Sequence, residues 1–180
     1  MRLRPWTVRS RTTLFETPYG MGVHREVVEL PDGRTIDDYY QVTATDAAIV
    51  AALTGDGCFV LLRQYLHGPR RVGLSLPGGQ IEAGEPPLRA AQRELREETG
   101  YAGPDWRSLG TLTRNANQGG GTEHLFLAHG VARVGVPVPH DLEEQEIVLL
   151  EPDAVRSALR DGAVPVVVHV ALLAMALLGL

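Results

Sequence analysis

The arrangement of hydrophobic and polar positions over residues 1–45 predicts three β-strands. Residues 7–15 and 22–30 carry strand-like runs with threonine and valine, and residues 38–45 alternate as a third strand. The stretch 31–34, Pro-Asp-Gly-Arg, has the chemistry of a turn. We therefore expect a small antiparallel sheet over residues 1–45.

A sheet of three short strands is too thin to be stable alone. We expect it to pack either on the rest of the chain, residues 46–180, or on a second subunit. The sequence shows no internal repeat and no low-complexity segment. The pattern therefore favours two parts, an N-terminal sheet over residues 1–45 and a main domain over residues 46–180.

The main domain begins with two apolar runs, residues 46–53 and 58–63. A Gly-Asp-Gly sequence between them is a strong hairpin signal. Further strand-like runs follow at 106–113, 123–129 and 147–150. These runs predict a sheet of several strands.

Two polar segments between these runs read as loops. Residues 67–76 lead to Leu-Pro-Gly-Gly, in which Gly78 and Gly79 let the backbone approach another group closely. Residues 114–122 form a long glycine-rich stretch, and loops of this kind usually carry substrate contacts. The simpler reading of Gly78 and Gly79 is a tight turn, and both readings can hold together.

Residues 88–99 have the period of a helix. Pro86 and Pro87 suit its start, where an N–H lacks a partner in any case, and Gly100 suits the left-handed position after its end. One apolar stripe of this helix is expected to be buried: Leu88, Ala91, Leu95 and Thr99.

Three carboxylates lie beside that stripe. At about 100° per residue, Glu94, Glu97 and Glu98 fall within an arc of about 100° on one face. Such charges repel each other, whereas a hard divalent cation such as magnesium binds carboxylate oxygens and keeps room for substrate phosphates. Arg93 stands four residues before Glu97 and can hold it in place. On composition alone, a solvated charged face is the simpler explanation.

The end of the chain predicts two helices. Residues 153–160 form the first, and residues 163–180 are almost wholly apolar. A membrane anchor needs about 20 apolar residues. Pro165 and His169 count against an anchor, so we expect a core or dimer-interface helix and no membrane association.

Composition narrows the function. The net charge of −5 argues against a general nucleic-acid binder. The single cysteine, Cys58, cannot form an internal disulfide and reads as a small buried residue. The N-terminus has basic residues without an apolar stretch behind them, so we expect no secretory signal and a cytoplasmic enzyme.

The spacing of the helix residues makes the enzyme reading specific. The fixed positions are Gly79, Glu85, Arg93-Glu94-Leu95, Glu97-Glu98 and Gly100-Tyr101. This frame resembles the signature of the Nudix hydrolases, which more often have an aliphatic residue where Tyr101 stands. The resemblance implies an α+β fold, an α/β/α sandwich with a mixed central sheet.

Within that family the chain resembles the ADP-ribose pyrophosphatases and related nucleoside diphosphate sugar hydrolases. This type implies a homodimer in which the N-terminal sheet crosses to the partner and aromatic residues sandwich the adenine. Trp6, Phe15 and Tyr19 are candidates for that role, and each could equally be core. Three positions depart from the type: Ser75, Leu66 and the stretch 115–117.

The resemblance also implies site residues. Glu94, Glu97, Glu98 and the Gly78 carbonyl would hold magnesium, with manganese as the alternative ion, and Arg93 would support them. A loop carboxylate would act as base.

The candidates for that base are Glu143, Glu144 and Glu146, with Glu143 and Glu144 preferred because Glu146 is expected to point inward beside Ile147. Three arginines could meet substrate phosphates, although each could be a plain surface charge: Arg63, Arg70 and Arg114.

The reaction that the resemblance implies is magnesium-dependent hydrolysis of the diphosphate linkage of a nucleoside diphosphate sugar, with ADP-ribose giving AMP and ribose 5-phosphate. Two alternatives stay open. One is a hydrolase of modified nucleoside triphosphates or dinucleotide polyphosphates. The other is a Nudix-fold nucleotide sensor without catalytic activity, and the presence of all three glutamates on the helix argues against it.

Overall fold

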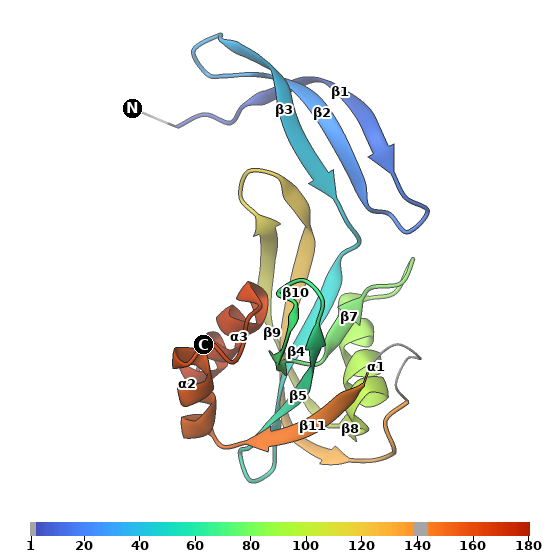
Figure 1. The fold of residues 1–180 in the computed structure, drawn as a ribbon, viewed down its shortest axis with the longest axis vertical. Helices are drawn as coiled ribbons and strands as arrows, with labels where there is room; N and C mark the ends of the chain where they lie inside the picture. Colours follow the sequence, from blue (N-terminus) through green and yellow to red (C-terminus); the bar gives the residue numbers. More distant parts are fainter. Residues whose placement is uncertain (1–2, 139–143) are drawn as a thin grey trace. The chain divides into compact units, whose positions relative to one another are not determined.

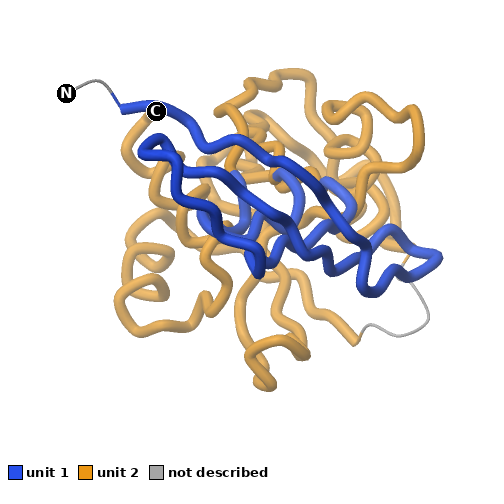
Figure 2. Tube along the Cα trace, turned by 90° about the horizontal axis from the view of Figure 1, so that it is seen from above, with its two compact units in different colours: residues 1–46, 113–122 blue, residues 47–112, 123–180 orange. Residues whose placement is uncertain are grey.

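The computed structural model describes residues 3–138 and 144–180. The chain divides into two compact units, which Figure 2 shows in different colours. Unit 1 comprises Met1–Asp46 with Thr113–Thr122, and unit 2 comprises Ala47–Leu112 with Glu123–Leu180. The segment 114–122, expected as a loop of the main domain, therefore belongs to the N-terminal unit.

Unit 1 is built on a three-stranded antiparallel sheet. The strands are β1 (Thr7–Glu16), β2 (Gly22–Glu29) and β3 (Thr35–Thr43), with β2 in the middle. All three expected strands are present, although β3 begins three residues early. Gly119, near the turn between two later strands, pairs with Val42 of β3.

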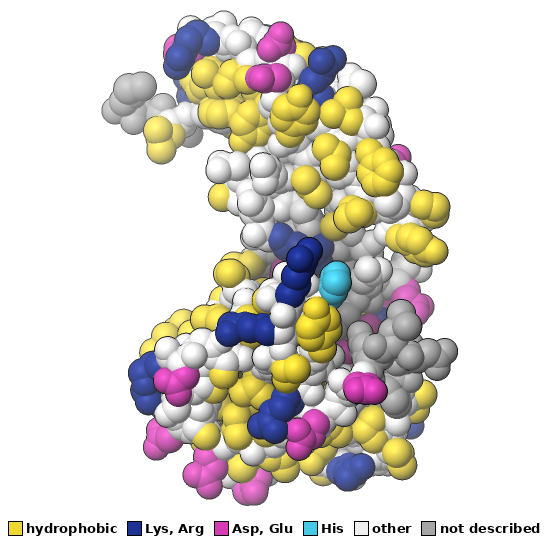
Figure 3. All heavy atoms as spheres, in the orientation of Figure 1, with side chains coloured by type: hydrophobic (Ala, Val, Ile, Leu, Met, Phe, Trp, Pro, Cys, Tyr) yellow, Lys and Arg dark blue, Asp and Glu magenta, His cyan; other side chains and the backbone are white. Residues whose placement is uncertain are grey.

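The inward face of β2 is partly polar. His24 is buried, and its Nδ1 and Nε2 lie 3.1 Å and 2.9 Å from the hydroxyl oxygens of Thr13 and Thr43. Hydrophobic side chains instead lie on the outside of unit 1, as the yellow spheres over β1–β3 in Figure 3 show. The exposed ones include Val8, Leu14, Phe15, Tyr19, Met21 and Tyr40.

Unit 2 is built around β4 (Ala47–Thr54). β10 (Gly119–Arg133) runs parallel to β4, whereas β5 (Phe59–Leu66) and the short β7 (Gly78–Gln80) run antiparallel to it. The sheet extends through β5 to β6 (Arg71–Ser75) and β11 (Gln145–Leu150), and β10 also pairs with β8 (Tyr101–Ala102) and β9 (Asp105–Asn115). The sheet is therefore mixed.

Helices cover both faces of this sheet. In Figure 1, α1 (Pro87–Thr99) lies on one side, and α2 (Pro152–Arg160) and α3 (Val167–Leu177) lie on the other. Alternate residues of β4 face the two sides, because successive side chains of a strand point in opposite directions. Ile49 packs in the cluster that contains Leu172 of α3, and Val50 packs in the cluster that contains Leu95 of α1. The expected α/β/α sandwich is confirmed.

Two expected loops are largely strands. Residues 67–76 were expected as a loop, but Arg71–Ser75 folds back on β5, with Ser75 opposite Leu62. The loop over 114–122 is shorter than expected, because β9 reaches Asn115 and β10 begins at Gly119. Pairing with a neighbouring strand stabilises both segments, and their own sequences do not reveal that neighbour.

The apolar C-terminal helix lies in the core of unit 2. Leu172 and Leu173 of α3 are fully buried in the cluster shared with β4 and β5. Across the described parts of the chain, no helix combines the length and apolar character needed to cross a membrane. Of the two roles expected for residues 163–180, a core helix or a dimer-interface helix, this packing supports the core helix.

Candidate active site on helix α1

The ends of α1 follow the local chemistry of the sequence. Pro87 occupies the first turn, and Gly100 follows the helix with φ of 71°, its N–H donating to the carbonyl of Arg96 at 2.8 Å. The expected buried stripe is correct for Ala91, Leu95 and Thr99 but wrong for Leu88, which is 39% exposed. The buried face of the helix includes two of its glutamates, Glu94 and Glu98.

Those two glutamates, Glu94 and Glu98, lie against the backbone of the Gly-Gly segment. The N–H of Gly78 donates to Oε2 of Glu98 at 2.8 Å. The two residues are only 6% and 8% exposed. Burying a carboxylate lowers the free energy of unfolding unless the group is paired. Holding both side chains here therefore costs the fold some stability.

Glycine is required at both positions of that segment. A Cβ built on Gly79 would lie 2.7 Å from Oε2 of Glu94. A Cβ on Gly78 would lie 2.8 Å from Cδ1 of Ile49, and Gly78 has φ of +157°. The absence of side chains therefore allows the helix carboxylates to approach the backbone closely.

Arg93 connects the acidic residues of this site. Its Nε and Nη2 donate to the two carboxylate oxygens of Glu85, each at 3.0 Å. Its Nη1 donates to Glu94 at 2.7 Å and to Glu97 at 3.2 Å. The bond from Arg93 lowers the pKa of the Glu85 carboxyl, and the Glu85, Glu94 and Glu97 carboxylates in turn raise the pKa of the Arg93 guanidinium. Glu97 is thus directed toward Arg93 and is partly exposed.

The donor set fits a cation that uses few protein ligands. In the described part of the chain, no three acidic, histidine or cysteine side chains converge to hold a metal ion by themselves. Magnesium is usually held by one or two carboxylates together with water and substrate phosphates. Glu94 and Glu98 beside the Gly78 backbone match that requirement. Because Gly79 has no Cβ, the space next to the Glu94 carboxylate stays open.

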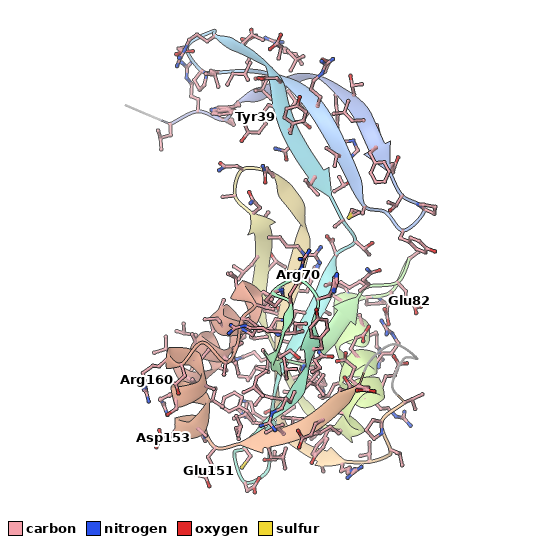
Figure 4. The ribbon with its side chains drawn as sticks, in the orientation of Figure 1. Tyr39, Arg70, Glu82, Glu151, Asp153 and Arg160 are labelled. Atoms are coloured by element: carbon pink, nitrogen blue, oxygen red, sulfur yellow. The ribbon has the colours of Figure 1, made fainter. Side chains whose placement is uncertain are left out.

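The other predicted residues of unit 2 lie elsewhere. Arg63, on β5, pairs with Glu146 of β11 at 3.0 Å. Glu146 was expected to point inward, but its side chain is 65% exposed, because the β11 register turns it toward the outer face with Arg63. Glu144 is exposed, and Glu143 lies outside the described residues. Arg70 stands exposed between β5 and β6 with φ of 54° (Figure 4).

Four predicted residues lie in unit 1, and two of them, Arg114 and Trp6, contact other residues of that unit. Arg114 donates from Nη1 to the Gly120 carbonyl at 2.8 Å. Trp6 packs edge-on against Tyr39, with ring centroids 5.5 Å apart, beside a cavity of about 410 Å³; Figure 4 labels Tyr39 on β3. Tyr39 was missed, although the alternation over 38–45 offered a signal for it. Phe15 and Tyr19 are exposed, so neither is core within the chain.

A second cavity, of about 700 Å³, adjoins the opposite side of α1. Its lining includes Arg89, Gln92, Arg93, Arg96, Glu97 and Trp106. A helical wheel places these helix residues on one face, so their spacing offered a signal for this surface, which was not predicted. Buried Glu94 and Glu98 are not part of this cavity's lining.

Comparison with protein families matches both parts of the chain. The NUDIX domain family matches residues 43–169, and the family of nucleoside diphosphate sugar hydrolase N-terminal domains matches residues 6–42. The Nudix match covers well over half of the chain, so the family is established.

Characterised relatives agree with this. Over 135 residues, the chain is 33% identical to a CMP-5'-(N-acetyl-N-hydroxy-3-aminopropyl)phosphonate hydrolase from Streptomyces rubellomurinus, covering 75% of this chain and 65% of the relative. It is 29% identical to an ADP-ribose pyrophosphatase from Bacillus subtilis, covering 75% and 71%. An ADP-ribose pyrophosphatase from Mycobacterium tuberculosis is 32% identical over 122 residues, covering 67% of this chain and 58% of the relative.

The fold also has a solved counterpart. A crystal structure described as an ADP compounds hydrolase superposes with a TM-score of 0.83, covering 98% of this chain and 94% of the other at 21% identity. At that identity the likeness shows the fold alone. The chain spans between 58% and 71% of the length of these three relatives. The family match over residues 43–169 shows that the chain belongs to the Nudix family.

Proposed function

We propose that this chain hydrolyses the diphosphate linkage of a nucleoside diphosphate sugar, and that ADP-ribose, giving AMP and ribose 5-phosphate, is its substrate. The observation that carries the proposal is the approach of Glu94 and Glu98, from one face of α1, to the Gly78–Gly79 backbone. The names of two relatives, each an ADP-ribose pyrophosphatase, support the choice of substrate.

In this proposal the residues of α1 divide their roles. Glu94, Glu98 and the Gly78 carbonyl hold a divalent cation, and Glu97 assists them. Arg93 orients the side chains of Glu94 and Glu97, because its Nη1 donates a hydrogen bond to each carboxylate. Glu85 fixes Arg93 with two parallel bonds, the geometry in which a guanidinium and a carboxylate pair best.

Hydrolysis breaks one P–O bond of the bridge and forms one to the oxygen of water, so each product carries a terminal phosphate. When bound, magnesium, or manganese as the alternative, would offset phosphate charge and lower the pKa of a coordinated water. In our proposal, the carboxylate of Glu143 or Glu144 would accept a proton from the attacking water.

Substrate contacts complete the proposal. Arg63, Arg70 and Arg114 are our candidates for the phosphates, and Trp6 is our candidate for the base. Arg63 already pairs with Glu146, so contact with a phosphate would require it to exchange that partner. The Trp6–Tyr39 pair beside its cavity has the edge-on aromatic geometry and the open space that a base could use.

A panel of substrates tests this function. ADP-ribose, other nucleoside diphosphate sugars, a CMP-linked phosphonate, modified nucleoside triphosphates and dinucleotide polyphosphates are incubated with magnesium, and the products are separated. We expect AMP and ribose 5-phosphate from ADP-ribose, and no product after chelation. Release of pyrophosphate from a triphosphate would instead favour the other hydrolase class, and binding without turnover would favour a sensor.

Glu98→Gln tests the site itself. Removing one anionic ligand should lower kcat about a hundredfold or more, because each tenfold corresponds to about 1.4 kcal/mol of transition-state stabilisation. Circular dichroism and thermal unfolding should show that the fold is retained. The matched control is Glu151→Gln, at an exposed glutamate before α2, which should keep full activity. Normal turnover with unchanged magnesium dependence in Glu98→Gln would remove the proposed metal site.

A further inference from the structure

The backbone between β6 and β7 is held at closely spaced points by three different elements. The N–H of Leu76 donates to Nδ1 of His169, on α3, at 2.9 Å. The carbonyl of Pro77 accepts from the N–H of Val50, on β4, at 2.9 Å. The N–H of Gly78 donates to Glu98, on α1, at 2.8 Å. A chain of three consecutive residues thus joins the C-terminal helix to a proposed metal ligand.

His169 stands out within its own helix. The sequence of α3, VVHVALLAMAL, holds it as the one polar side chain. Burial lowers the pKa of His169 to about 4, so the imidazole is neutral at neutral pH. Because Nδ1 accepts the bond from Leu76, the proton of the neutral ring lies on Nε2.

The bond to Leu76 is a constraint on a buried segment. Leu76 is only 2% exposed, so its N–H would lack a partner if the imidazole were removed. A buried donor left without an acceptor is costly, and the backbone shifts to relieve it. Pro77 limits how that shift can be absorbed, since its ring fixes φ. The displacement would therefore reach Gly78.

We propose that His169 is a positioning residue for the active site, which holds the Leu76–Gly78 backbone in register so that Gly78 meets Glu98. The proposal rests on the proposed function, in which Glu98 and Gly78 bind a divalent cation. It extends that function to a residue 71 positions beyond Glu98, outside the sequence signature of the family.

The test compares variants that keep or remove the acceptor. His169→Leu and His169→Phe introduce an apolar side chain that cannot accept the hydrogen bond from Leu76. His169→Asn places its amide oxygen close to the position of Nδ1. Leu173→Ala, at a fully buried position of the same helix, is the control for loss of stability alone. The use of both Leu and Phe guards against a variant that fails to fold.

Two measurements are made on each purified variant. The first is turnover as a function of magnesium and of substrate, at a temperature well below every variant's unfolding midpoint. The second is hydrogen exchange of the Leu76 and Gly78 amides, followed by NMR on the metal-free protein. The second measurement does not depend on catalysis.

We expect the Leu and Phe variants to need about tenfold more magnesium for half-maximal activity, the usual scale for an outer-shell partner, with KM for the nucleotide little changed. Both amides should exchange faster in these two variants. His169→Asn should restore the magnesium dependence and the slow exchange, and Leu173→Ala should leave the magnesium dependence unaltered.

Two results would overturn the proposal. The first is faster exchange confined to Leu76, with Gly78 unchanged. The second is an unaltered magnesium requirement in both acceptor-free variants. If the wild-type chain shows no metal-dependent turnover, the proposed function fails, and exchange at Gly78 then decides by itself whether His169 holds this backbone.

Discussion

Among the individual residues of the site, Arg93 shows how far a local pattern reaches. The spacing of four residues predicted its contact with Glu97, and that bond is present at 3.2 Å. The paired bonds to Glu85 involve a residue that precedes the helix, so they depend on how the segment before α1 folds back. The same guanidinium also holds Glu94, and a helical wheel does not single out this neighbouring position.

Gly79 offers a prediction at this scale. In Gly79→Ala the new Cβ would press on the Glu94 carboxylate, so we expect activity to fall about tenfold or more as that ligand moves. The free energy of unfolding should fall by about 1–3 kcal/mol, the usual cost of overpacking. Steady-state kinetics and urea unfolding measure the two effects.

The control for this variant is Gly55→Ala. A Cβ at Gly55 meets nothing within 4 Å, and Gly55 lies in the turn between β4 and β5. It should leave activity unchanged. Equal activities of the two alanine variants would show that the close approach of Gly79 and Glu94 does not matter for turnover.

For whole elements, the ends of α1 were predictable because caps depend on adjacent residues. Proline at the start and a left-handed glycine after the end act over a few bonds of the chain. The strand β6 was not predictable in this way. Arg71–Ser75 is a strand because β5 offers it a partner, and two further backbone atoms of the region are held by α3 and β4.

The C-terminal end of α1 gives a prediction at this scale. Gly100 has a left-handed φ, and a Cβ there would lie 2.5 Å from the carbonyl oxygen of Gly135. Gly100→Ala should therefore destabilise the protein by more than the roughly 1–2 kcal/mol of left-handed strain alone. Thermal and urea unfolding of the purified variant measure the loss.

Gly130→Ala separates the two causes. Gly130 also has a left-handed φ, of +64°, but a Cβ there meets nothing within 4 Å. This variant should lose only about 1–2 kcal/mol. If Gly100→Ala and Gly130→Ala are equally stable, the close approach between Gly100 and the segment after β10 does not contribute to the free energy of unfolding.

Considered as a whole molecule, the chain presents hydrophobic side chains on unit 1 that a water-soluble monomer would rarely leave uncovered. Phe15 is 55% exposed, and Leu14 and Val8 of the same strand are 53% and 54% exposed. We expect a homodimer that covers this sheet, with twice the 19.5 kDa mass of the chain by light scattering. This assembly is our proposal for the role of residues 1–45.

The matching substitution is Phe15→Asp, which should shift the mass toward that of a monomer. Val167→Asp introduces the same charge at a valine of α3 that is 84% exposed, and it should leave the mass unchanged. A wild-type monomer at micromolar concentration would contradict the dimer and the role proposed for the N-terminal sheet.

The sequence alone determined the features that depend on neighbours along the chain. These are the limits of α1, the single face that carries Glu94 and Glu98, and the frame that identifies the family. Helix periodicity and capping act within one or two turns, so a single stretch of sequence contains all the information they need.

Only the tertiary structure decided which distant groups meet. Gly78 reaches Glu98 across 20 positions, and His169 reaches Leu76 across 93. Such contacts depend on how the sheet pairs and how the helices pack on its two faces, and many arrangements share the same local pattern. For this reason the glutamates and the Gly78–Gly79 segment could be named from the sequence, whereas the bond between Gly78 and Glu98 and the histidine that holds this backbone required the fold.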